Sequence, residues 1–189
     1  MKFVIEHLDS RLYKWSFLEY NHISKIVGSR NLIFTNVKSR FARQILENLG
    51  KVYKKSVLQM NLKSVCVLDP FAKKTLEPKD RRKFRYLVFG GILGDCPMKR
   101  RTTKNLTAKM IFAESRNLGH KQMSTDTAVA VAKRIIDGEN LSMLKFKEKL
   151  EINLRKGESI ILPFRYLVVD DKVLLPDGFI DFLSKRKGF

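Results

Sequence analysis

The chain has 189 residues, 44% hydrophobic and 30% charged, so it is large and apolar enough to fold around a core and is not disordered. Lys and Arg number 38 against 19 Asp and Glu, and the resulting net charge of +19 favours a polyanionic partner such as nucleic acid or a ribosomal particle over a lipid surface. The chain has only two cysteines, which excludes a disulfide framework, and no run of about 18 apolar residues, which excludes a membrane span. It also lacks the apolar region of a signal peptide, so we expect a cytoplasmic protein.

Strand and helix patterns alternate along the first two-thirds of the chain. The apolar runs predict strands at Phe3–Ile5, Asn31–Thr35, Val65–Leu68, Phe84–Phe89 and Met110–Ala113. Helical periodicity predicts helices at Leu12–Val27, Ser39–Leu49 and Thr125–Asp137. Beyond these we expect several short strands between Leu144 and Leu175 and a final helix at Asp177–Lys185. The alternation predicts one α/β domain over residues 1–189, with a mainly parallel sheet and helices on both faces.

The first predicted helix carries an acidic residue on its apolar side. The apolar residues of this helix share an arc of about 80°, and Glu19 falls in the middle of that arc with His22 at its edge. A carboxylate in that position must be paired, be protonated or face a cavity. Glu19 is therefore either an ion-pair partner for an arginine or a site carboxylate, supported by Glu6 and His7 at the end of the first strand.

Two glycine-containing segments follow strands of the predicted sheet. Phe84–Gly94, FRYLVFGGILG, is an apolar strand that runs into three glycines, and Asn117–Thr127, NLGHKQMSTDT, is a glycine turn followed by a capped helix. Glycine lets the backbone approach a ligand closely. Loops at strand ends form the ligand sites of α/β sheets, so these segments predict a small-molecule site.

Missing motifs narrow the chemistry. The chain has neither a GxxxxGK[ST] loop nor a GxGxxG fingerprint, which argues against phosphoryl transfer and dinucleotide use. Its cysteines and three histidines have no metal-ligand spacing, so no metal is expected. An organic cofactor or a pure binding role remains.

The two glycine loops resemble those of a known class. Residues 118–125, LGHKQMST, are similar to the cofactor loop of the SPOUT methyltransferases, and Phe89–Asp95, FGGILGD, is similar to the loop through which their chain is threaded. Short motifs along nearly the whole chain resemble, in the same order, those of one branch of archaeal and eukaryotic methyltransferases. The fungal member of this branch methylates an arginine of a small-subunit ribosomal protein. The motifs are IEH from Ile5, LEY from Leu18, LDP from Leu68, KQM from Lys121, DTA from Asp126, PFRY from Pro163 and LPDG from Leu175.

The resemblance implies a SPOUT α/β knot fold with a deep C-terminal trefoil knot. It also implies S-adenosylmethionine as cofactor, in a monomer or in a homodimer that pairs through the knot helices. The residues it assigns to cofactor binding are Leu68, Asp69, Pro70, Phe89, Gly90, Gly91, Gly94, Leu118, Gly119, Lys121, Gln122, Met123, Thr125, Phe164 and Arg165. Either Arg101 or Arg165 is expected to pair with the cofactor carboxylate.

The sequence departs from related patterns at two positions. His120 stands where an Asp is expected in the arginine-methylating branch. Leu93 stands where the guanine-N1 tRNA methyltransferases of the superfamily carry an acidic residue, which argues against recognition of a guanine edge.

The predicted function is methylation of an arginine side chain of a ribosomal protein. Methyl transfer depends mainly on positioning the acceptor, and a guanidinium is oriented by carboxylates, for which Asp95, Glu19 and Glu6 are the candidates in that order. One alternative is an RNA methyltransferase, with Phe164 or Tyr166 stacking on the base; another is a binding module without catalysis. The basic residues Lys99, Arg100, Arg101 and Lys104 either contact RNA beside the acceptor or form a solvated loop.

Overall fold

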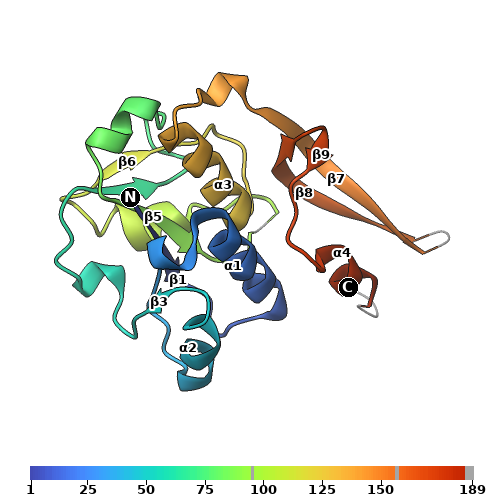
Figure 1. The fold of residues 1–189 in the computed structure, drawn as a ribbon, viewed down its shortest axis with the longest axis horizontal. Helices are drawn as coiled ribbons and strands as arrows, with labels where there is room; N and C mark the ends of the chain where they lie inside the picture. The colour runs from blue at the N-terminus through green and yellow to red at the C-terminus, as the bar shows by residue number, and fades with distance from the viewer. Residues whose placement is uncertain (95, 156–157, 186–189) are drawn as a thin grey trace.

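Six parallel strands form the central sheet of the protein (Figure 1). The structure is a computed structural model that describes residues 1–94, 96–155 and 158–185. From one edge to the other, the strands are β3 (Lys51–Val52), β2 (Leu32–Thr35), β1 (Lys2–His7), β5 (Tyr86–Gly91), β4 (Val65–Leu68) and β6 (Glu114–Arg116). In the register of the central strand β1, Ile5 lies opposite Phe34 of β2 and Phe89 of β5. The predicted parallel α/β sheet is confirmed.

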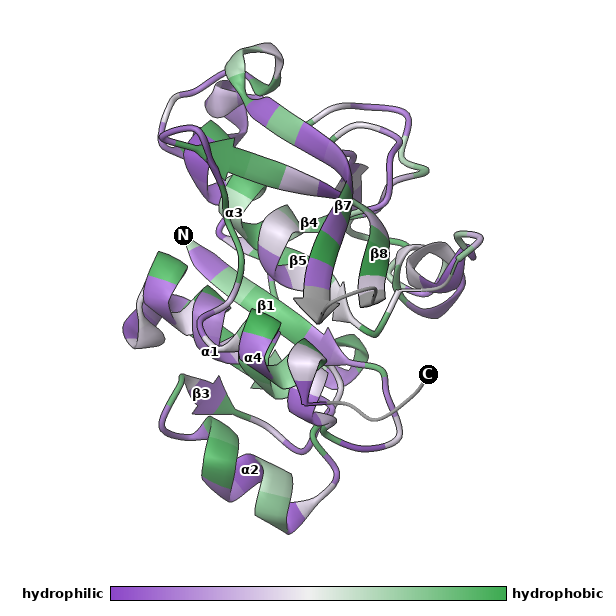
Figure 2. Ribbon diagram, turned by 90° about the vertical axis from the view of Figure 1, so that its right-hand side faces the viewer, coloured by the Kyte–Doolittle hydropathy of each residue, from purple (hydrophilic) through white to green (hydrophobic). Residues whose placement is uncertain are grey.

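The sheet buries both of its faces. On one face Phe3 and Ile5 pack in a core with the helices α1 (Lys14–Val27), α2 (Arg40–Leu46) and α3 (Thr125–Ile136). On the other face Val4 packs with Val57 and Leu106, which belong to the short helical segments η2 (Val57–Gln59) and η4 (Thr103–Thr107). Successive strand residues point to opposite faces, so a strand buried on both sides is a continuous apolar run. Figure 2 shows that run in the middle of β1, with polar residues at its ends.

The helices therefore cover the two faces unequally. All three long helices lie on one face, while the other is covered by η2, η4 and their adjoining loops. The remaining short helical segments are η1 (Ser29–Asn31), η3 (Pro78–Arg82) and η5 (Leu141–Met143). Among the described residues, no helix has the length and apolar character needed to cross a membrane.

The C-terminal third forms an antiparallel hairpin beside the sheet (Figure 1). It consists of β7 (Lys145–Arg155) and β8 (Glu158–Val169), followed by the short β9 (Lys172–Val173) and by α4 (Phe179–Ser184). The ring of Phe179 meets the ring of Trp15 edge to face at 4.8 Å, so α4 is held against α1. The N–H of Arg165 donates to the carbonyl of Gln122 at 2.9 Å and fastens β8 to the segment that precedes α3.

Two predicted strand assignments are wrong. The strand expected at Met110–Ala113 lies instead at Glu114–Arg116, because Met110 and Ala113 pack on the sheet face rather than joining its edge. Instead of the several short strands expected between Leu144 and Leu175, the described residues form the two long strands β7 and β8 and one short strand, β9. A register shift between Glu148 and Leu150 interrupts their alternation, and Lys149 between them has φ of 54°, so the sequence pattern looks broken where the strand continues.

The helix predictions hold with shifted ends. The helix expected at Ser39–Leu49 covers Arg40–Leu46, and Ser39 is its N-cap, accepting a hydrogen bond from the N–H of Ala42 at 3.3 Å. The helix expected at Asp177–Lys185 covers Phe179–Ser184. The trefoil knot, the single domain and the oligomeric state remain predictions.

Candidate active site

A cavity lies at the carboxyl ends of β4 and β5, where the loops after these strands meet the segment before α3. This is the position in which parallel α/β sheets bind ligands. Most of the residues expected to bind a cofactor line it together: Leu68, Asp69, Pro70, Phe89, Gly90, Gly94, Leu118, Gly119, Lys121, Gln122, Met123 and Thr125. The cavity is also lined by the segment from Met98 to Thr103, in which Arg101 is the one residue that was expected to contact the cofactor.

Three of the expected cofactor residues lie elsewhere. A Cβ on Gly91 would clash with the Tyr20 hydroxyl oxygen, so this glycine faces the core and not the cavity. Phe164 and Arg165 line an adjacent cleft, together with His120 and Glu148. The cleft and the cavity share the lining residues Met98, Lys121 and Gln122. The first catalytic candidate, Asp95, lies outside the described residues.

Two glycines allow the cavity loops to pack closely. Gly119 has φ of +89°, a left-handed conformation that favours glycine. A Cβ on Gly94 would lie 2.5 Å from both Gln122 Nε2 and Phe164 Cζ, so a side chain there would push the loop after β5 away from the hairpin. Both positions therefore favour glycine over a residue with a side chain, while the predicted close approach of the backbone to a ligand stays a prediction.

Asp69 is a structural residue of the cavity wall. Its carboxylate accepts hydrogen bonds from the Phe71 N–H at 2.9 Å and from the hydroxyls of Thr103 at 3.1 Å and Thr107 at 2.7 Å. The side chain is 2% exposed. Asp69 thus fastens the basic segment and η4 to the end of β4, and its oxygens are occupied by protein donors.

Cationic side chains form one side of the cavity. Lys99, Arg100 and Arg101 line it. Arg101 Nη2 donates to the carbonyl of Leu93 at 3.0 Å, and the Arg100 guanidinium lies 4.3 Å from the centre of the Phe71 ring. Part of the basic segment is therefore built into the site and is not a solvated loop. Of the two arginines expected near a cofactor carboxylate, only Arg101 lines the cavity.

Arg165 is bound to other groups in the adjacent cleft. Its Nε lies 3.0 Å from Glu148 Oε1, and its guanidinium is 4.0 Å from the centre of the Phe146 ring. Lys121 Nζ lies 3.1 Å from the same Glu148 oxygen. Glu148 thus connects the hairpin to the cofactor loop.

Glu6 is held by structural hydrogen bonds. Its carboxylate accepts from the hydroxyls of Thr35 and Ser56, each at 2.5 Å, and from the N–H of Val57 at 2.9 Å. It is buried and does not line the cavity. Glu6 joins β1, β2 and η2, which leaves no geometric support for its predicted role as an acceptor carboxylate.

Glu19 lies immediately behind the cavity wall. It accepts a hydrogen bond from Trp15 Nε1 at 2.8 Å and one from the N–H of Thr125 at 3.3 Å. Burial, reinforced by the nearby charge of Asp126, raises the pKa of the Glu19 carboxyl to about 8. The partners described for Glu19 are thus Trp15 and Thr125 and not the arginine that one hypothesis expected. It is His22 that pairs with a carboxylate, Nδ1 lying 2.8 Å from Asp126 Oδ2.

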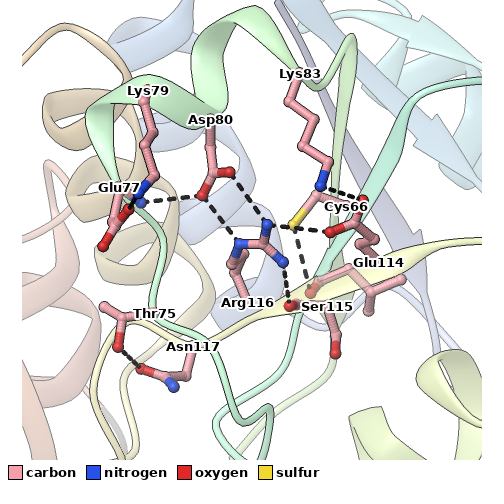
Figure 3. Close-up of polar contacts among 11 residues, drawn as sticks. Cys66, Thr75, Glu77, Lys79, Asp80, Lys83, Glu114, Ser115, Arg116 and Asn117 are labelled. Carbon is pink, nitrogen blue, oxygen red and sulfur yellow. Dashed lines mark hydrogen bonds and ion pairs between the residues drawn. The ribbon is translucent and has the colours of Figure 1, made fainter.

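Polar contacts of Arg116 and Asn117 support the start of the segment 117–123 (Figure 3). The Arg116 guanidinium donates to both oxygens of Asp80, at 3.0 and 3.2 Å, and to Glu114 at 3.1 Å. Asn117, next in sequence, accepts from the Gly119 N–H at 2.9 Å and from the Thr75 hydroxyl at 3.1 Å. The network fixes the backbone on which Gly119 turns.

Three residues support the loops in ways that the sequence did not predict. Asn117 was included as the first residue of the glycine segment but was given no role, and the only signal for Arg116 is that it directly precedes this segment. Asp9 Oδ2 accepts the N–H of Leu93 at 3.2 Å and so holds the loop after β5, although nothing in the local pattern around Asp9 indicates this role.

His120 connects two loops of the cavity. Its Nδ1 lies 3.0 Å from the carbonyl oxygen of Pro70, which belongs to the loop after β4. His120, which stands where the resemblance led us to expect an Asp, thus places a ring nitrogen and not a carboxylate between these two loops.

The cysteines and acidic residues give no sign of metal chemistry within the described parts of the chain. No group of three or more His, Cys, Asp or Glu side chains is placed there to hold a metal ion. Cys66 is fully buried in β4, as predicted, and burial raises the pKa of its thiol to about 12.

The chemistry of the cavity suits S-adenosylmethionine. Leu68, Phe89, Leu118 and Met123 offer an apolar surface for a purine, the backbone of residues 118–123 offers hydrogen bonds, and Arg101 lies on the cationic side, where a carboxylate would bind. A parallel α/β sheet with such a cavity between two glycine loops agrees with the SPOUT methyltransferases that these loops resemble.

Comparison with known proteins identifies the family. The model of the SFM1-like protein arginine N-methyltransferases matches residues 2–188, and the chain belongs to this family. It is 36% identical to the protein arginine N-methyltransferase SFM1 of Saccharomyces cerevisiae over 203 residues, which cover 98% of this chain and 95% of the yeast protein. The predicted class, an S-adenosylmethionine-dependent methyltransferase, is thereby confirmed.

Solved structures agree with this assignment. The yeast arginine methyltransferase SFM1 complexed with SAM matches with a TM-score of 0.90 and 37% identity, over 97% of this chain and 90% of that one. The same enzyme complexed with SAH gives a TM-score of 0.89, over 97% of this chain and 94% of that one. A dual specific Trm10 from Thermococcus kodakaraensis, at a TM-score of 0.58 and 19% identity, covers 74% of this chain and 94% of that one and shares the fold alone.

Proposed function

We propose that the protein transfers a methyl group from S-adenosylmethionine to an arginine side chain of a ribosomal protein. The observation that carries the proposal is the cavity between the two glycine loops, which joins an apolar wall to the cations Lys99, Arg100 and Arg101. The matched relatives, named arginine methyltransferases and solved with SAM and SAH, support the same reaction.

The cofactor residues act mainly by positioning. The apolar side chains of Leu68, Phe89, Leu118 and Met123 would hold the adenine of S-adenosylmethionine, and Arg101 would hold the carboxylate of its methionine part. When bound, S-adenosylmethionine supplies a methyl group on a positively charged sulfur. Since displacement on that carbon requires alignment, the rigidity of the segment 117–123, supported by Arg116 and Asn117, is the main contribution of the protein to the rate.

The acceptor side chain enters through the adjacent cleft. The cleft opens next to the cavity, and its wall contains Phe164, Glu148 and the shared residues Met98 and Gln122. An arginine guanidinium must be oriented and must lose a proton as the methyl group is added, which a carboxylate assists. Asp95, which directly follows the cavity residue Gly94 in sequence, is the carboxylate that we propose for this role.

The charge of the protein supports a ribosomal substrate. A net charge of +19 exceeds what a small cofactor requires and favours a substrate embedded in RNA, with Lys99, Arg100 and Lys104 close to the phosphate backbone. Such a substrate implies work in the cytoplasm. Methylation of RNA itself is less favoured, because the matched family and its yeast member are named for protein arginine.

Labelling of ribosomes tests the proposal. Ribosomes from a strain that lacks the protein are incubated with the purified protein and S-adenosylmethionine labelled in the methyl group. We expect the label to be released by protease and not by nuclease, and to be recovered in methylarginine after acid hydrolysis. Label released by nuclease would show RNA methylation, and no label with intact cofactor binding would show another acceptor.

A further inference from the structure

Two buried carboxyl groups lie behind the α3 wall of the cavity. Glu19 of α1 is 6% exposed and Asp126 of α3 is 2% exposed. Glu19 Oε2 accepts the N–H of Thr125 at 3.3 Å, and Thr125 itself lines the cavity. One residue therefore separates the Glu19 carboxyl from whatever charge the cavity holds.

The polar partners of the two carboxyl groups are incomplete. Trp15 Nε1 donates to Glu19 at 2.8 Å, and His22 Nδ1 lies 2.8 Å from Asp126 Oδ2. Asp126 Oδ1 is buried and has no hydrogen-bond partner in the part of the chain that the structure describes. Two acidic groups thus face one histidine, and a buried pair of this kind responds strongly to an added cation because little water screens it.

Among the residues that the structure describes, the groups that act on the Glu19 carboxyl are Asp126, Trp15 and Thr125, none of which is a cation. From β8, the hydroxyl of Tyr166 faces the two acids, and burial raises its pKa, so it stays neutral near neutral pH. Outside His22, Lys25 and Asp177 pair with each other at 2.6 Å. Because burial and Asp126 raise the pKa of Glu19 to about 8, the proton on Glu19 can be gained or lost near physiological pH.

The two forms of the proposed cofactor differ by one charge. The methyl donor carries a positive sulfonium, while the thioether that remains after transfer is neutral at sulfur. A positive charge in the cavity favours the ionised form of a nearby carboxyl, and its removal favours the protonated form.

We propose that Glu19, coupled to Asp126, senses the charge of the ligand in the cavity, losing its proton to solvent when the donor binds and regaining one after methyl transfer. The pair then favours the charged donor over the neutral product and assists product release. Glu19 acts through Thr125 and the field across the wall, as a positioning residue and not a catalytic one. The inference rests on the proposed function, since it requires S-adenosylmethionine in this cavity.

Calorimetric titration of the protein with S-adenosylmethionine and with S-adenosylhomocysteine tests the inference. The titrations are run between about pH 6.5 and 9, in pairs of buffers with different ionisation enthalpies. In the wild type we expect the ratio of product Kd to donor Kd to rise about tenfold over this range, as one unit of pKa change on donor binding requires. Proton release should be larger for the donor.

The ligands carry ionisable groups of their own, so two variants are used to separate the pH dependence caused by Glu19 from that caused by the ligands. In Glu19→Gln the extra rise of the ratio and the extra proton release should disappear. In the control Glu6→Gln, which alters an equally buried carboxyl that hydrogen-bonds away from the cavity, both should remain as in the wild type. Should Glu19→Gln not fold, Asp126→Asn replaces it, and the ratio should then change at a lower pH because the charge that raises the pKa of Glu19 is gone.

The outcomes distinguish failure of the charge sensor from failure of the proposed function. Equal pH profiles for the wild type and Glu19→Gln, or an unmoved midpoint in Asp126→Asn, would overturn the charge sensor and leave the proposed function intact. If neither ligand bound the wild type, the proposed function would fail and the sensor with it.

Discussion

The ring nitrogen Nδ1 of His120 lies 3.0 Å from the carbonyl oxygen of Pro70 and joins the loop after β4 to the segment before α3. Pro70 and the sequence neighbours of His120 line the cavity, so the contact holds the two loops together beside it.

Replacing His120 by alanine should weaken cofactor binding without unfolding the protein. A single hydrogen bond contributes about 0.5–1.5 kcal/mol net, so the Kd for S-adenosylmethionine should rise about two- to tenfold. Calorimetric titration measures the change. An unchanged Kd would show that the cofactor loops keep their arrangement without this contact.

Replacing Gly119 by valine should abolish cofactor binding. The residue has φ of +89°, which a β-branched side chain rarely adopts, and its Cβ would lie 3.2 Å from Arg165 Nη1. Thermal shift by S-adenosylmethionine measures the loss. The matched control is Gly138→Ala, also at a positive φ of +120° but with nothing within 4 Å of its Cβ. This control should lose stability and keep the full ligand-induced shift.

Removing one partner of the buried ion pair between Arg116 and Asp80 should destabilise the protein strongly. Both side chains are almost fully buried, at 7% and 5% exposed, so Asp80→Asn leaves the guanidinium without its main partner. Breaking such a pair costs about 3–5 kcal/mol. Urea denaturation measures the loss, and breaking the exposed pair between Lys25 and Asp177 by Lys25→Met should cost less than about 1 kcal/mol.

Glu19→Gln should change how stability depends on pH. The folded carboxyl binds its proton up to about pH 8, whereas the unfolded one ionises near its ordinary pKa of 4.5. Between these values unfolding releases a proton, so the free energy of unfolding of the wild type falls as pH rises and levels off above pH 8. Glutamine carries no proton to release, so the Glu19→Gln variant lacks this contribution to the free energy of unfolding. Its melting temperature relative to the wild type should therefore rise from pH 5 to pH 8, which differential scanning calorimetry records.

Asp95→Asn should separate catalysis from binding. Asparagine keeps the size of the side chain and loses its charge. If this carboxylate orients the acceptor, turnover on ribosomes should fall about 100-fold or more, while cofactor Kd changes less than about tenfold. Full turnover in the variant would rule out Asp95 as the acceptor carboxylate.

The sequence predicts the central strands of the sheet and the glycine loops well, because both depend on local patterns. β1, β4 and β5 are apolar runs buried on both faces, and the loops carry glycines in a recognisable order. The functions of single acidic residues depend on distant partners and were not predictable in this way. Glu6 is occupied by Ser56 and Val57, fifty residues and more away in sequence, and nothing near Glu6 indicates that contact.

The two long strands of the hairpin, β7 and β8, were not predictable for a similar reason. Its long strands carry exposed charged residues and a bulge at Lys149. Their apolar positions are divided between two cores, since Ile152 and Leu162 pack with residues of α1 and α4 while Leu167 belongs to the core beside the main sheet. Packing between such remote elements leaves little local trace. Arg116 and Asn117, which position the cofactor loop, belong to the same category.

The order of strands in the sheet has a consequence for how the protein reaches its native state. β1 pairs with β5, which lies more than eighty residues later in the sequence, and the N–H of Arg165 donates to Gln122 of the segment 118–123. Contacts of such long sequence separation slow folding. Competence to hold a ligand therefore arises late, after the hairpin has emerged from the translating ribosome and docked, and ligand binding by a nascent chain would report that synthesis has passed β8.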